Sequence, residues 1–490
     1  MSPAPDLPAR RRRQLLAAPL PAPLLALLGL AAAALLVLVP IALWRLDTRL
    51  LGSTYGKPFQ PFELFGFCVT AALACFGAHK LRRAAPGYEI DRWAGAAGLI
   101  LTSLYTLPLL VDHPLRSWDY ECYEQAARAL LAGRDPYAGT GYLYPPLVAQ
   151  AFAGAYRLVH AAVQAAHLSG LGDVEIFGCL FYAYQCLQLF LVVAAFALCR
   201  VLAQRLGLRP AHAAVLCTLL FVFNNPLLRT LKHGQVNLYV LDAILVAMLV
   251  PYRGPLAVGL GLALATHIKL YPILFVLPLW WIGARSAATW AVGLTAAGFV
   301  LERRLAGGVL MDFVRSLPGF PRGTLLRDNS LHSIVYNFAH ALALDRILPA
   351  RAVDVAALLL GVGLSGWIFW RVFVRTALAA PAAAPDGAAR ARDQAGLFGF
   401  TLLIMMLLSP LVWEHHYVLT LPLAIWALAR CLAPGTSRPR RFHAVLAAAL
   451  VYTPPTFDVF PVSYHRLAGL LWLLWLATRP PSPDEPRAAA

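Results

Sequence analysis

The stretch Ser117–Leu147, SWDYECYEQAARALLAGRDPYAGTGYLYPPL, is polar and rich in aromatic and turn residues, and long apolar runs lie on both sides of it. Its first half has apolar residues at helical spacing, which predicts a short amphipathic helix. The predicted apolar face consists of Tyr120, Tyr123, Ala127, Leu130 and Leu131. Gly133 is a residue type that ends helices. We therefore expect a surface helix followed by a loop, with Asp119 in the first helical turn.

The composition around this stretch indicates an integral membrane protein. The chain has 490 residues, of which 60% are hydrophobic and 13% are charged. The apolar runs are too long and too many for one buried core, and a run of about 20 apolar residues is enough to cross a bilayer. The fold class predicted is an all-α polytopic membrane protein, with roughly 11–14 transmembrane helices by that length rule.

The distribution of positive charge suggests how the chain is oriented. The formal net charge is +17. The basic residues lie in short loops between apolar runs, which is the positive-inside pattern of a multi-pass plasma-membrane protein. Arg10–Arg13 then place the N-terminus in the cytoplasm, and Asp119 falls on the outer face. No basic surface with interleaved aromatic residues occurs on a soluble domain, so we predict no nucleic-acid partner.

Three segments are expected along the chain. Residues 1–92 are predicted to form a cytoplasmic N-terminus and an accessory transmembrane hairpin, and residues 93–431 the main transmembrane module. Within that module the Ala/Pro/Arg-rich stretch 377–395 is predicted to be a flexible cytoplasmic linker. Residues 432–490 are predicted to be a C-terminal hairpin and a disordered tail. Most of the eight cysteines lie in apolar runs, so no disulfide framework is expected.

Asp119 has two interpretations. A carboxylate at the start of an amphipathic helix can serve as a general base. It can also be an acidic residue that the helix dipole favours at that position. Glu121 and Glu124 are competing acids, but they lie on the face opposite the apolar residues.

The loop after the predicted helix contains Tyr137 and Tyr144 beside proline and glycine turns. One interpretation is an ordered loop packed on the membrane surface. The other is a sugar-binding loop, because tyrosine rings and hydroxyls suit carbohydrate.

Two further sites combine polar groups with apolar sequence. Gln235 and Asn237 lie at the predicted start of a helix, where they either cap it or bind a hydroxyl-rich or phosphate ligand. Lys269 lies between two short apolar runs, where it either extends to the membrane surface or binds an anion.

His415 and His416 are adjacent, so they do not share a helical face and are poor joint ligands for one metal ion. We interpret one as a phosphate-binding residue and the other as a packing residue, and expect neither a metal site nor a cofactor. The sequence contains no Walker A motif, no dinucleotide-binding fingerprint and no serine nucleophile elbow. A donor carried by a membrane lipid fits an outward-facing site better than a cytosolic nucleotide sugar.

The polar clusters all fall on the same predicted face, which suggests one site at the outer leaflet. A lipid or solute transporter without bond chemistry is the alternative. Transporters of this kind usually contain inverted repeats with binding groups near the bilayer midplane. No such repeat is visible in this sequence.

An ordered series of motifs resembles a known family. The series is Asp119, GRDPY (133–137), YPPL (144–147), HGQVN (233–237), KLYP (269–272), DNSL (328–331) and SPLVWEHHYV (409–418). It is similar to the polyprenyl-phosphate-mannose-dependent alpha-mannosyltransferases of the GT-C class, glycosyltransferase family eighty-seven. The resemblance covers about residues 100–430 and is not specific for the sugar.

The resemblance implies a GT-C-like helical bundle and inverting transfer of a hexose from a polyprenyl-phosphate donor to a hydroxyl of a lipid or glycan acceptor. It implies that Asp119 is the base, because the family's expected base is a carboxylate of the first large external loop. Lys269, Arg327, His415 and His416 are the candidates for binding the donor phosphate. Tyr137, Tyr144, Gln235, Asn237 and Asn329 are the candidates for binding the substrates.

Overall fold

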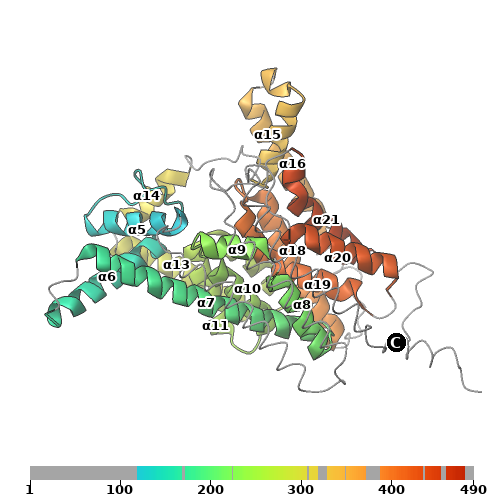
Figure 1. Cartoon of the computed structure of the whole chain (residues 1–490), viewed down its shortest axis with the longest axis horizontal. Helices are drawn as coiled ribbons and strands as arrows, with labels where there is room; N and C mark the ends of the chain where they lie inside the picture. The colour runs from blue at the N-terminus through green and yellow to red at the C-terminus, as the bar shows by residue number, and fades with distance from the viewer. Residues whose placement is uncertain are drawn as a thin grey trace, which may run out of the picture. The chain divides into compact units, whose positions relative to one another are not determined.

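The computed structural model describes residues 118–167, 172–222, 224–305, 308–317, 328–347, 349–370, 387–433, 436–453 and 460–479. These residues form helices and loops with no β-strand, in agreement with the predicted all-α class (Figure 1). The predicted N-terminal hairpin, Arg10–Arg13 and Arg327 lie outside the described residues. The chain divides into two compact units, and α8 (Pro210–Val222) is the described helix of the smaller one.

The larger unit contains the predicted site. Its helices are α5 (Trp118–Leu131), α6 (Pro146–Ala165), α7 (Asp173–Arg205), α9 (Asn225–Lys232), α10 (Asn237–Leu249), α11 (Pro255–Ile268), η3 (Tyr271–Phe275), α12 (Val276–Trp281), α13 (Arg285–Leu305), α14 (Val309–Ser316), α15 (Leu331–Ala341), η5 (Leu344–Arg346), α16 (Ala350–Phe369), α18 (Gly387–Leu408), η7 (Glu414–Thr420), α19 (Leu421–Cys431), α20 (Arg438–Tyr452), η8 (Val462–Tyr464) and α21 (His465–Thr478). α7 packs against α10, α10 against α11, and α9 against η7. The two C-terminal helices, α20 and α21, lie side by side (Figure 1).

Small residues let α11 and α13 approach closely. A Cβ atom added to Gly259 of α11 would lie 2.4 Å from the Cβ of Trp290 and 2.9 Å from the backbone nitrogen of Ala291. Ala263 on α11 and Ala287 on α13 are also buried. Small side chains at a helix contact are characteristic of helix pairs in membranes, where close van der Waals packing drives association.

Two helices of the described part are long and apolar enough to cross a bilayer, Asp173–Arg205 and Arg351–Phe369, and a broken helix pair would make a third. Other apolar segments form shorter helices: α10 has 13 residues and α11 has 14. The total of 11–14 spans includes residues outside the described part and stays a prediction. Large apolar side chains on α16 are exposed, including Leu358, Leu359 and Trp367, and such a surface suits lipid better than water.

One boundary differs from the prediction. α18 begins at Gly387, so residues 387–395 of the predicted linker are helical. The apolar segment that begins at Pro146 forms a helix of 20 residues, α6, which is not among the helices apolar enough to cross a bilayer.

Candidate functional site

The predicted amphipathic helix is α5, and it places Asp119 in its first turn. Tyr120, Tyr123 and Ala127 are buried, as the apolar pattern predicts. Glu124, predicted to face solvent, is buried as well and forms an ion pair with Arg128 at 2.9 Å. α5 packs against α6, and Tyr120 lies edge-on to the ring of Phe181 in α7, with ring centroids 4.8 Å apart. Aromatic packing of α5 on its neighbours therefore fixes the position of Asp119.

The surroundings of Asp119 change its acidity. Burial raises the pKa of Asp119 to about 6, although a hydrogen bond from the Gln235 side chain and the positive charge of Lys269 lower it. A carboxyl group with this pKa is ionised at neutral pH and takes up a proton more readily than an exposed aspartate does. Such a group is suited to general-base chemistry.

The loop after α5 that contains Tyr137 and Tyr144 orients Gln235, the hydrogen-bond partner of Asp119. Tyr144 donates a hydrogen bond from its hydroxyl to Oε1 of Gln235 at 2.8 Å, which leaves the Gln235 amino group to face Asp119. Tyr137 in turn donates to the backbone oxygen of Tyr144 at 3.1 Å. Tyr137 also packs on Phe313, with ring centroids 5.7 Å apart. The loop is therefore ordered by its own hydrogen bonds, and Tyr144 reaches the neighbourhood of Asp119.

The backbone around Gln235 is fixed from α7. Tyr184 donates to the carbonyl oxygen of Gly234 at 2.6 Å, and the amide of Gln188 donates to the carbonyl oxygen of Gln235 at 2.8 Å. Gly234 has φ +61°, a left-handed conformation that favours glycine. Asn237 does not cap α10, because the cap position is occupied by Val236. Its side chain is instead directed toward Lys269.

Lys269 lies at the C-terminal end of α11 and is 7% exposed, so it does not extend to the membrane surface. Its Nζ donates to Oδ1 of Asn237 at 2.6 Å and lies 3.1 Å from Nε2 of His416. It also lies 5.4 Å from the centre of the Tyr144 ring. A positive charge on Lys269 lowers the pKa of Asp119, so the two groups are close. A lysine amino group and a candidate base therefore occupy one site.

The two histidines have different environments. His416 contacts Lys269, and its Nδ1 accepts a hydrogen bond from the backbone nitrogen of Trp413 at 2.9 Å. The backbone oxygen of His415 accepts hydrogen bonds from Thr230 at 3.1 Å and Asn237 at 3.2 Å. The His415 ring packs beside that of His416, with centroids 4.5 Å apart. His416 is thus the histidine whose side chain joins the site.

We define the Asp119 cluster as Asp119, Tyr144, Gln235, Asn237, Lys269 and His416. These residues come from elements well separated along the chain, from α5 to η7, the segment before α19. Six residues predicted from sequence are therefore close in space. No group of three or more His, Cys, Asp or Glu side chains in the described part is arranged to hold a metal ion.

Two buried acids near the cluster were not assigned a role from the sequence. Glu414 lies 3.6 Å from Nε of Arg229 and 2.5 Å from Nη2 of Arg466. Asp328 accepts hydrogen bonds from the backbone nitrogens of Ser330 at 3.0 Å and Val412 at 2.7 Å. These contacts fix the segment that carries the histidines. Apart from Ser330, each partner of Glu414 and Asp328 lies 50 or more residues away from the acid in the sequence. Local sequence spacing therefore does not indicate these contacts.

Asn329 also contacts the segment that carries the histidines. It is buried, and its backbone nitrogen donates to the backbone oxygen of Val412 at 2.8 Å. The 328–331 motif and the 409–418 motif are therefore joined by hydrogen bonds, although about 80 residues separate them. Asn329 stays a predicted substrate-binding residue, and Arg327 lies outside the described residues.

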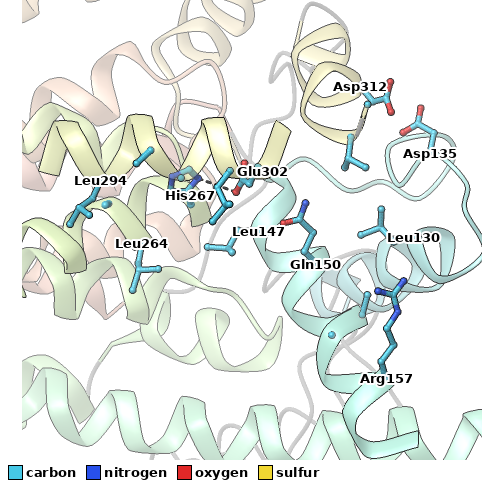
Figure 2. Close-up of a pocket in the computed structure, with 18 of the residues that line it drawn as sticks. Leu130, Asp135, Leu147, Gln150, Arg157, Leu264, His267, Leu294, Glu302 and Asp312 are labelled. Carbon is cyan, nitrogen blue, oxygen red and sulfur yellow. Dashed lines mark ion pairs between the residues drawn. The ribbon is translucent and has the colours of Figure 1, made fainter. Parts of the chain in front are cut away.

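A separate cavity of about 1010 Å³ lies at the other end of α5 (Figure 2). Leu147, Leu264 and Leu294 line its apolar part. Figure 2 shows Asp135 and Asp312 together at one side and His267 paired with Glu302 at another, with Nδ1 and Oε1 3.1 Å apart. Asp119 does not line this cavity. His267 lies two residues before Lys269 in the sequence, but its side chain lines this separate cavity.

Comparison with known proteins identifies the relatives of this chain. The sequence profile described as Glycosyltransferase family 87 matches residues 142–388. No solved structure matches the chain significantly.

The curated relatives include two proteins named polyprenol-phosphate-mannose-dependent alpha-(1-2)-phosphatidylinositol pentamannoside mannosyltransferase. The one from Mycolicibacterium smegmatis is 29% identical over 245 residues, which is 49% of this chain and 54% of the relative. The one from Mycobacterium tuberculosis is 25% identical over 232 residues, which is 46% of this chain and 47% of the relative. The matches thus span about half the length of these two relatives.

A third relative, also from M. smegmatis, is named polyprenol-phosphate-mannose-dependent alpha-(1-2)-phosphatidylinositol mannoside mannosyltransferase. It is 26% identical over 402 residues, covering 73% of this chain and 81% of the relative.

Proposed function

Because this chain belongs to glycosyltransferase family 87, we propose that it is a membrane hexosyltransferase that moves mannose from a polyprenyl-phosphate donor to a hydroxyl of an acceptor. The names of all three relatives specify a polyprenol-phosphate-mannose donor and a phosphatidylinositol mannoside acceptor. For this chain we propose the donor class and a lipid or glycan acceptor. The transfer takes place at the outer face of the plasma membrane.

The observation that carries the proposal is the position of a candidate base beside a buried lysine. The pKa of Asp119 is raised by burial and lowered by the charge of Lys269, so the two groups act on one another. Transfer from a lipid phosphate needs both of these functions. A base accepts the proton of the attacking hydroxyl, and a positive group stabilises the phosphate as it leaves.

The proposed reaction is a single displacement. The acceptor oxygen attacks the anomeric carbon while its proton passes to Asp119. The bond between the anomeric carbon and the phosphate oxygen breaks, and the electron pair stays on the polyprenyl phosphate. Lys269 and His416 face that phosphate and stabilise its added charge. One displacement inverts the configuration at the anomeric carbon, and the neutralising groups of the protein take the place of a metal ion.

Other residues of the site have supporting roles in this proposal. Gln235 holds the Asp119 carboxylate and is itself oriented by Tyr144. Asn237 holds Lys269. Tyr137, Tyr144 and Asn329 are the proposed contacts to the sugar and acceptor. His415 and Arg327 are further candidates for the donor phosphate.

The raised pKa of Asp119 predicts a pH dependence. The base must be ionised, and protonation below about pH 6 removes it. We expect kcat/KM of the purified protein to fall about tenfold for each pH unit below that value. A rate measurement with saturating acceptor across this range tests the assignment. A profile that stays flat two units further into acid would contradict it.

Replacing the cation tests the phosphate role. Lys269→Met keeps most of the length of the side chain and removes its charge and hydrogen bonding. We expect kcat/KM for the donor to fall by about 10²–10³-fold, the usual effect of removing one group that stabilises developing negative charge. Lys232→Met is the matched control, because Lys232 lies at the end of α9 outside the Asp119 cluster. Equal activity of the two variants would remove Lys269 from the proposed mechanism.

A further inference from the structure

The ring of His416 has a defined hydrogen position. The backbone N–H of Trp413 donates to Nδ1 of His416 at 2.9 Å, so Nδ1 holds a lone pair. In a neutral imidazole the other nitrogen then carries the hydrogen. Nε2 of His416 is therefore an N–H donor, and this donor faces Lys269.

The group that faces Nε2–H of His416 must accept a hydrogen bond. Nζ of Lys269 lies 3.1 Å from Nε2 of His416. An ammonium group has three N–H donors and no acceptor, whereas a neutral amine has one lone pair. The contact is a hydrogen bond when Lys269 is a neutral amine that accepts from His416, and two N–H groups oppose each other when it is an ammonium.

The other contact of Lys269 agrees with an amine. The amide nitrogen of Asn237 donates to the backbone oxygen of His415 at 3.2 Å, which turns Oδ1 of Asn237 toward Lys269. The amine donates one N–H to that oxygen at 2.6 Å. One accepted and one donated hydrogen bond satisfy a neutral Nζ.

The surroundings of Lys269 have opposing effects on whether its amino group is charged. Burial of Lys269 disfavours an ammonium. The rings of Tyr144 and Tyr271, whose centres lie 5.4 Å and 5.8 Å from Nζ, favour it. The carboxylate of Asp119 on α5 also favours it. The other titratable and charged groups around this region are Arg229 on α9, His233 directly after α9, His415 and His416 on η7, and Tyr144 and Tyr271.

We propose that Lys269 is a neutral amine in the donor-free site and takes up one proton when the donor phosphate binds, with His416 as the positioning residue that holds the amine form. The inference rests on the proposed function, because it names what the phosphate does to the site. The proton comes from solvent and forms the third N–H bond of the ammonium. The Nε2–H of His416 is then released to donate to a phosphate oxygen.

The same change has a consequence after transfer. The donor is a phosphodiester with one negative charge, and the product is a phosphate monoester with a second ionisable oxygen. The added charge keeps Lys269 as an ammonium while the product is bound. The proton leaves when the polyprenyl phosphate leaves, which returns the amine and its hydrogen bond from His416.

Titration calorimetry tests the proposal with the whole protein. Polyprenyl-phosphate-mannose is titrated into the purified protein without acceptor, in HEPES and in Tris at equal pH. The two buffers differ in ionisation enthalpy, so the difference in binding enthalpy gives the number of protons exchanged. At about pH 8 Asp119 is ionised before and after binding and the phosphodiester does not titrate, so the exchange reports Lys269. We expect an uptake of about one proton per donor bound.

Two variants separate this role from a structural one. Lys269→Arg keeps a positive group that stays charged, and we expect binding without proton uptake. His416→Gln can turn its amide oxygen toward an ammonium, and we expect retained binding with less than half of the wild-type uptake. If His416 merely supports the fold, His416→Gln leaves the uptake unchanged, and the positioning role is overturned.

The outcomes for the wild-type protein are also distinct. Binding with no buffer dependence shows that Lys269 is already charged, which overturns this inference and leaves the proposed function standing. Failure to bind polyprenyl-phosphate-mannose overturns the proposed function and this inference together.

Discussion

Asp119→Asn is expected to lower the transfer rate by about 10²–10⁴-fold, which is the usual contribution of a general base. The substitution keeps the shape of the side chain, and its oxygen can still accept the hydrogen bond from Gln235. It cannot take up the proton of the attacking hydroxyl. Donor binding should change much less than turnover, because Lys269 and His416 are unaltered. Single-turnover transfer and donor titration with the purified variant separate the two quantities.

Glu121→Gln is the matched control for this variant. Glu121 lies on the same helix, is exposed, and accepts a hydrogen bond from Gln125 at 3.2 Å. Glu121→Gln removes one negative charge within one turn of Asp119, as Asp119→Asn does, and we expect it to have wild-type turnover. If Asp119→Asn also has wild-type turnover, another group accepts the proton and the role given to Asp119 is wrong.

Glu414→Gln is expected to have the largest effect on stability. Glu414 is buried and lies between Arg229 and Arg466, and Arg466 is fully buried. Removing the carboxylate charge leaves two buried guanidinium groups without their counter-charge. Breaking a buried ion pair by changing one partner costs about 3–5 kcal/mol. We expect a large loss of thermal stability, followed in a thermal unfolding experiment on the purified protein in detergent.

The matched control for Glu414 is Asp312→Asn. Asp312 pairs with Arg315 at 3.2 Å, but the Arg315 side chain is 74% exposed. Ion pairs at the surface contribute about 0–1 kcal/mol, so the control should unfold close to the wild-type temperature. Equal stability of the two variants would mean that Glu414 does not hold η7 in place, and the support given to His416 would need another source.

The sequence predicts the local parts of the site well. The period of Tyr120, Tyr123 and Ala127 predicts α5 and its buried face, and this is confirmed. The motif order also predicts that Asp119 and Lys269 belong together, and the structure places them in one cluster. These features depend on short-range pattern and on the order of motifs, both of which are visible in one sequence.

The contacts that depend on distant partners could not be predicted. Glu414 has no interpretation in the sequence because its partner Arg466 is 52 residues away. The orientation of Gln235 depends on Tyr144, which is 91 residues away. His267 precedes Lys269 by two residues, yet it pairs with Glu302 on α13 and lines the separate cavity. The spacing of residues in the sequence does not show which distant residues form such pairs.

The backbone conformation at the end of α11 could not be predicted either, because a short apolar run does not show how the residue after it is oriented. The break after α11 is important for function because Lys269 lies in it with extended backbone, φ −145° and ψ 131°. A continuous helix would have turned that side chain with the helical period and away from Asn237.

Mannosyl transfer from a lipid-linked donor is tested most directly by a donor panel with the purified wild-type protein in a membrane mimic. Polyprenyl-phosphate-mannose, other polyprenyl-phosphate sugars and GDP-mannose are each supplied with a phosphatidylinositol mannoside acceptor, and transfer of labelled sugar to the acceptor is measured. We predict a mannosylated product from polyprenyl-phosphate-mannose and none from GDP-mannose. Transfer from GDP-mannose, or binding of the lipid donor with no sugar transferred, would contradict the account.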